Sequence, residues 1–159
     1  MNRLSRGLAA LGLLTLTCAG AASAEDPSFT GRWRWNKAES TVAPGEALPK
    51  DILTEIASAQ QSRVQWTVTI TDIRDAKHTQ SFDGPADGQP HPVVGSVQGE
   101  TAAFTVGDNS MQAVFRNPAG ESDTVMCTLS NDRRKMTCRG TVVESKGRSS
   151  NYIDVYDRL

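Results

Sequence analysis

The sequence has few residues of the kinds that most catalytic and metal-binding motifs require. Its 159 residues include three cysteines and two histidines, His78 and His91. A protein metal site usually takes three or four ligands. The chain also lacks Cys-x-x-Cys, Gly-x-Ser-x-Gly, a phosphate-binding loop, His-Glu-x-x-His and a dinucleotide-binding fingerprint. These absences predict no metal site and no cofactor, and they leave open whether the protein is an enzyme.

Long apolar runs and an excess of basic charge are also missing. The apolar stretch at residues 8–16 is too short to span a bilayer, which needs roughly 20 residues. Two arginines precede it and Ala-Ser-Ala follows it at residues 22–24, as in a secretory signal peptide. We therefore expect a signal peptide over residues 1–24 and a single periplasmic or secreted domain over residues 25–159.

Cleavage at that point would leave 15 basic and 18 acidic residues, a net charge of −3 against −1 for the whole chain. This balance indicates neither a nucleic-acid surface nor a basic membrane patch. We expect no nucleic-acid partner and no membrane insertion once the signal peptide has been removed.

Two cysteines, Cys127 and Cys138, remain in the expected mature chain. They lie in "VMCTLSNDRRKMTCRG", where two alternating runs flank the polar turn "SNDRRK". A hairpin centred on this turn places Cys127 opposite Cys138 and Leu129 opposite Met136. In an exported chain this arrangement predicts a structural disulfide. Metal binding or redox catalysis is the alternative, and no histidine lies near enough in sequence to favour it.

Alternating apolar and polar residues dominate the rest of the chain. The clearest runs are "VQWTVTIT", "AAFTV", "MQAVF", "GTVVES" and "NYIDVYDRL", with turn signals every 8 to 12 residues or so. We count eight or nine short strands, and connections this tight require antiparallel pairing. The sequence therefore predicts a mainly β protein with a small closed antiparallel barrel, since closure removes unpaired edges. A β-sandwich is the alternative.

One segment breaks the alternation. "LPKDILTEIASAQQ", residues 48–61, has a proline at a suitable first helical position and an aspartate in the first turn. Apolar residues then follow at helical spacing, at positions 52, 53, 56 and 59. We expect one short amphipathic helix here, between the first strand and the others.

The segment "GRWRW" places Trp33 and Trp35 on one side of the first strand, directly after Gly31. Gly-x-Trp at the first strand, with an arginine near the last strand, resembles the pattern of lipocalins and other calycins. The stretches "FTGRWRWNKAES" and "FDGPADGQPHPV" also resemble a group of small exported bacterial lipocalin-like domains. The resemblance implies a barrel over residues 28–158, with Arg158 stacked on Trp33 to close the barrel floor.

The last strand carries the main candidate site residues. Tyr152, Asp154, Tyr156 and Arg158 share one face of it, and Ile153 shares the other face with Val155. If Arg158 covers the floor, Asp154 and both tyrosines point inward, where a buried acid must be paired or bind a polar group. If instead the isoleucine face points inward, the tyrosines are merely exposed. The sequence leaves both orientations open.

The candidates for ligand binding are Trp35, Trp66, Tyr152, Asp154 and Tyr156. Asp154 and the tyrosines are also weak candidates for acid–base catalysis. So is His91, because it lies between two prolines that stiffen its loop and near two aspartates.

Three functions remain open at this stage. The leading hypothesis is an exported soluble domain that holds a small apolar or amphipathic ligand in, or at the mouth of, a β-barrel. The second is a periplasmic inhibitor or another interaction protein with a protein partner. The third is a cofactor-independent isomerase or cyclase that works in the barrel cavity. Whether the barrel interior contains a cavity, and which side chains line it, distinguishes among these three functions.

Overall fold

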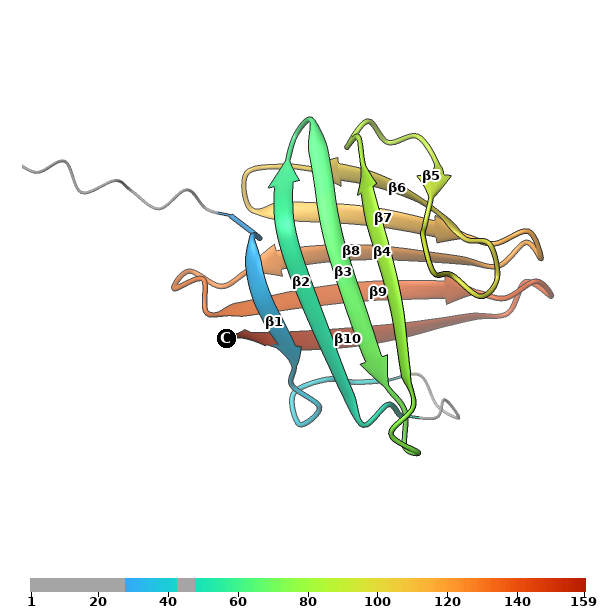
Figure 1. Ribbon diagram of the computed structural model, residues 1–159, viewed down its shortest axis with the longest axis horizontal. Coiled ribbons are helices and arrows are strands. Elements are labelled where there is room, and N and C mark those ends of the chain that lie inside the picture. The colour runs from blue at the N-terminus through green and yellow to red at the C-terminus, as the bar shows by residue number, and fades with distance from the viewer. Residues whose placement is uncertain (1–27, 43–47) are drawn as a thin grey trace, which may run out of the picture.

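The structure is a computed structural model that describes residues 28–42 and 48–159. The expected signal peptide lies outside the described residues. The described chain folds into one antiparallel sheet of ten strands, in the order β4-β3-β2-β1-β10-β9-β8-β7-β6-β5 (Figure 1). The strands are β1 (Gly31–Trp35), β2 (Asp51–Gln60), β3 (Arg63–Thr71), β4 (Lys77–Gly84), β5 (His91–Pro92), β6 (Thr101–Val106), β7 (Ser110–Arg116), β8 (Ser122–Leu129), β9 (Lys135–Val143) and β10 (Ser149–Arg158).

The sheet curls into a nearly closed barrel. Figure 1 shows β1 to β4 in front, crossing β6 to β10 behind. The two ends of the strand order meet where Ser81 of β4 and Val94, just after β5, exchange two backbone hydrogen bonds of 2.9 Å. Gly88, in the β4–β5 connection, donates a further backbone hydrogen bond to Phe104 at 2.9 Å. The mainly β, antiparallel barrel predicted from the sequence is confirmed in this coarse form.

The helix predicted over residues 48–61 is wrong. These residues form β2, which pairs with β1 on one side and β3 on the other. The register of β2 against β3 shifts between Ile56 and Ser58, which marks a β-bulge. The extra residue leaves Ile56 and Ala59, three positions apart, both packed into the core. The bulge therefore produces the helix-like spacing of apolar residues, while pairing on both edges fixes the strand.

The strand count is ten, against the eight or nine expected. The strands that the sequence did not predict are β2, in place of the helix, and the two-residue β5 within the proline-rich loop. The run "GTVVES", expected as a strand of its own, instead continues β9 as far as Val143. No helix in residues 28–42 or 48–159 is long and apolar enough to cross a membrane.

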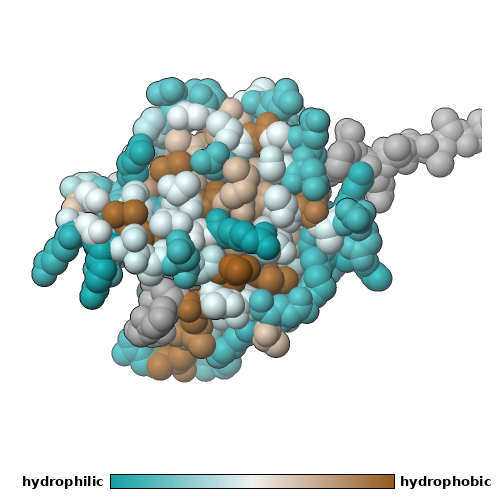
Figure 2. Space-filling model, turned by 180° about the vertical axis from the view of Figure 1, so that it is seen from behind, coloured by the Kyte–Doolittle hydropathy of each residue, from teal (hydrophilic) through white to brown (hydrophobic). Residues whose placement is uncertain are grey.

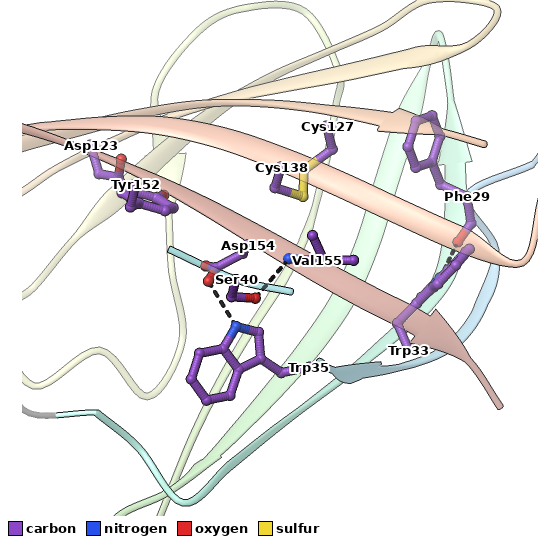
Figure 3. Close-up of a disulfide and its surroundings, with 10 residues drawn as sticks. All are labelled: Phe29, Trp33, Trp35, Ser40, Asp123, Cys127, Cys138, Tyr152, Asp154 and Val155. Atoms are coloured by element: carbon purple, nitrogen blue, oxygen red, sulfur yellow. Dashed lines mark hydrogen bonds between the residues drawn. A yellow bond between two sulfur atoms is a disulfide. The ribbon is translucent and has the colours of Figure 1, made fainter. Parts of the chain in front are cut away.

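The floor of the barrel is built around Trp33, which is fully buried. Its Nε1–H donates a hydrogen bond of 2.8 Å to the backbone oxygen of Phe29 (Figure 3). The guanidinium carbon of Arg158 lies 4.1 Å from the centre of the Trp33 ring. Gly31, at φ 138°, allows this approach, because a Cβ there would lie 2.7 Å from Nη1 of Arg158. The arginine thus covers the tryptophan where the chain enters the barrel.

Arg158 also hydrogen-bonds two backbone segments at the floor. Its guanidinium donates hydrogen bonds to the backbone oxygens of Thr30 at 2.6 Å, Arg133 at 2.8 Å and Ser28 at 2.9 Å. It therefore joins the approach to β1 and the β8–β9 turn to the end of β10.

The β8–β9 hairpin has the register expected from its sequence. Cys127 pairs with Cys138, and Leu129 pairs with Met136. The two cysteines form a disulfide between these neighbouring strands, and all four side chains belong to the core.

Candidate functional site

The barrel interior contains a cavity of about 170 Å³ that is open to solvent. Seven strands contribute the fifteen residues that line it, and only four of these residues have polar side chains: Thr54, Tyr152, Asp154 and Tyr156. Large rings, those of Trp66, Phe104 and Phe115, share the lining with small side chains such as Ala113 and Val125.

An aromatic cluster forms one part of the cavity wall. Trp66 of β3, Phe104 of β6 and Phe115 of β7 meet edge to face, with ring centroids 6.0–6.3 Å apart. Trp66 is 7% exposed. Its Nε1–H is buried and has no hydrogen-bond partner in the part of the chain that the structure describes. An unsatisfied buried donor costs about 1–3 kcal/mol, so this part of the wall is unusual for a closed core.

A polar stripe on β10 forms another part of the wall. Tyr152, Asp154 and Tyr156 all line the cavity, so their shared face points inward. The structure thereby brings together three of the candidates from the sequence with a fourth, Trp66. Trp35 is buried but does not line the cavity. It contacts this site through its Nε1–H, which donates a hydrogen bond of 2.8 Å to Oδ1 of Asp154 (Figure 3).

The two tyrosines hold their protons tightly. Burial raises the pKa of Tyr152 well above its usual range, and the negative charge of Asp123 raises it further. Burial likewise raises the pKa of Tyr156, with the charge of Asp154 as the next cause. Both phenols are therefore neutral hydrogen-bond donors at any physiological pH.

Sequence reasoning missed two residues that contact Tyr152, namely Asp123 and Gly140. The Tyr152 hydroxyl donates a hydrogen bond of 2.7 Å to Oδ2 of Asp123 on β8. Asp123 shares its strand face with Val125 and Cys127, and an acid on an otherwise apolar face was the available signal. Gly140 of β9 pairs with Tyr152, and a Cβ there would overlap the phenol ring. The glycine thus lets Tyr152 lie across β9 and reach Asp123.

His91 lies apart from this site. It is on β5, and its Nε2 lies 3.1 Å from Oδ1 of Asp87. The backbone N–H of Gln89, followed by the hydrogen bond from His91, lowers the pKa of Asp87. His91 does not line the cavity, so the structure does not bring it together with Asp154.

The described residues also contain no candidate metal centre. No group of three or more His, Cys, Asp or Glu side chains in residues 28–42 and 48–159 is placed to hold a metal ion.

No protein-family model matches the sequence, and no curated protein matches it. Solved structures with the same fold do match. The fluorescent protein UnaG, as its N57A mutant, is 13% identical with a TM-score of 0.53, over 82% of this chain and 96% of that one. Zebrafish ileal bile acid-binding protein, solved with cholic acid, is 13% identical with a TM-score of 0.48, over 82% of this chain and 98% of that one.

These likenesses concern the fold alone, because the sequence identity is low. The likeness to UnaG and the ten-stranded topology show an antiparallel β-barrel fold.

Proposed function

We propose that this protein is an exported, soluble binding domain that holds one small apolar or amphipathic molecule inside its barrel. The observation that carries the proposal is the cavity, which has an apolar wall and a short polar stripe. Ligand sites typically combine a largely apolar lining with a few placed polar groups.

The size of the cavity limits the ligand. Sites for drug-sized molecules occupy about 300–1,000 Å³. An engineered cavity of about 150 Å³ lined by apolar side chains stays dry and binds benzene. At about 170 Å³, this cavity fits a compound of one or two rings.

The proposal that the domain is exported rests on the sequence of residues 1–24 and on the Cys127–Cys138 disulfide. Disulfides form and persist mainly in oxidising compartments such as the periplasm. Export and the disulfide are therefore consistent with each other.

An interaction protein would be favoured by a filled barrel with a broad apolar outer patch. Instead, Figure 2 shows the apolar side chains on one face in separate small groups among hydrophilic ones. The large apolar side chains exposed among the described residues are Ile73, Val94, Val97, Met126 and Leu159. This surface supports ligand binding in the interior over recognition of a protein partner.

A second candidate function, cofactor-independent isomerisation or cyclisation, is favoured by one observation. Asp154 places a carboxylate in an apolar cavity beside two neutral phenols. A carboxylate in such a setting can take a proton from a bound substrate, while phenols stabilise the charge that develops.

Calorimetric titration with indole tests the binding proposal. We expect the wild-type protein to bind indole, and we expect Ala113→Phe to weaken binding at least tenfold because the new ring fills the cavity. Gln112→Phe is the matched control, since position 112 precedes Ala113 on β7 and lies outside the cavity lining. Equal affinity in the wild type and Ala113→Phe would place indole outside the cavity, and a wild-type protein that binds neither indole nor any other small aromatic compound would refute the proposal.

A further inference from the structure

The cavity lining carries negative charge and no positive charge. Asp154 is the only charged side chain among the fifteen lining residues, and none of them is Lys, Arg or His. A second carboxylate, that of Asp123, lies directly behind the wall and accepts the hydrogen bond from Tyr152. In a site of low dielectric constant, a carboxylate attracts a cation and repels an anion far more strongly than it does in water.

The aromatic rings of the lining also favour a cation over an anion. Trp66, Phe104 and Phe115 face the interior together with the two phenols of β10. The faces of aromatic rings carry partial negative charge, and aromatic-lined sites recognise ammonium groups. The cavity therefore combines a carboxylate and several aromatic rings within a volume suited to one or two rings of ligand.

We infer that the ligand is a small arylalkyl amine, which is protonated at neutral pH, and that the cavity rejects carboxylates of the same size. The ammonium group lies at Asp154 and the ring lies against the aromatic cluster. This inference rests on the proposed function and names the class of ligand for the same cavity.

Three probes that share a phenol ring and differ only in the head group test the inference. They are tyramine, with an ammonium group, 4-(2-hydroxyethyl)phenol, with a hydroxyl, and 4-hydroxyphenylacetate, with a carboxylate. Calorimetry on the full mature protein at neutral pH should show tyramine binding at least tenfold more tightly than the alcohol. The carboxylate should bind at least tenfold more weakly than the alcohol.

Asp154→Asn removes the charge with little change in shape. It should weaken tyramine binding at least tenfold and change binding of the alcohol less than threefold. Asp157→Asn is the matched control, because Asp157 lies on the same strand outside the cavity lining, where it pairs with Lys135. It should leave both affinities unchanged. If Asp154→Asn does not fold, the order of the three probe affinities for the wild-type protein still tests the inference.

The outcomes separate this inference from the proposed function. Equal binding of the three probes, tighter binding of the carboxylate, or binding of indole without any of the three would overturn the amine inference and leave the binding domain intact. Failure of indole and of all three probes would overturn both.

Discussion

Individual side chains determine which face of the last strand points inward. The sequence places Tyr152, Asp154 and Tyr156 on one face but leaves its direction open, because both faces of β10 carry apolar groups. The contact of Arg158 with Trp33 and the cavity lining resolve the choice in the structure. The sequence carried a signal for Asp123, an acid on an otherwise apolar strand face, whereas the role of Gly140 depends on which strands lie beside β10.

Alkaline titration tests this orientation, since Tyr152 and Tyr156 are the chain's only two tyrosines. The pKa of each is raised from an ordinary value of 10.0. Phenols of the unfolded chain lose protons above about pH 10, whereas the folded chain keeps them, so the unfolded state binds fewer protons. Folding stability should therefore fall as pH rises above 10, by up to about 1.4 kcal/mol per pH unit for each tyrosine.

The measurement is phenolate absorbance against pH, with urea-unfolded protein as the control. The folded protein should show no ionisation at a pH where the unfolded control is half ionised. Two phenols that titrate near pH 10 in a folded chain would mean that the tyrosine face of β10 is exposed.

Among the elements, the β8–β9 hairpin was fully predictable and β2 was not. In the hairpin, turn signals and alternation agree, and the symmetry of the two cysteines about the turn fixes the register. In β2, the bulge gives a strand the apolar spacing of a helix. The local sequence pattern could not reveal that β2 pairs with β1 on one edge and with β3 on the other. Tertiary pairing of this kind overrides local preference.

The hairpin leads to a prediction about stability. The Cys127–Cys138 bond closes a loop with a sequence separation of 11. The chain-entropy relation gives about 3 kcal/mol of stabilisation for a loop of this length. Urea unfolding of oxidised and reduced wild-type protein should differ by about that amount, and Cys127→Ala/Cys138→Ala should be insensitive to reductant. Equal stability of the two wild-type forms would show that the bond does not constrain the unfolded chain.

At the scale of the whole molecule, alternation and short turns indicated an antiparallel barrel, but not how it closes. Closure depends on Ser81 and Val94, which meet across a loop that the sequence marks only as rich in proline and glycine. The cavity was also invisible in the sequence. It arises because Ala113, Val125 and Val68 come from three strands and together leave space that no side chain fills.

If this space is a binding site, a small aromatic probe bound to the protein must lie inside the barrel. A crystal structure of the protein grown with indole should show the probe inside the barrel, in contact with Trp66, Phe104 and Tyr152. Indole found only on the outer surface, or a barrel interior filled by side chains with no space for the probe, would show that the barrel interior is not a binding site.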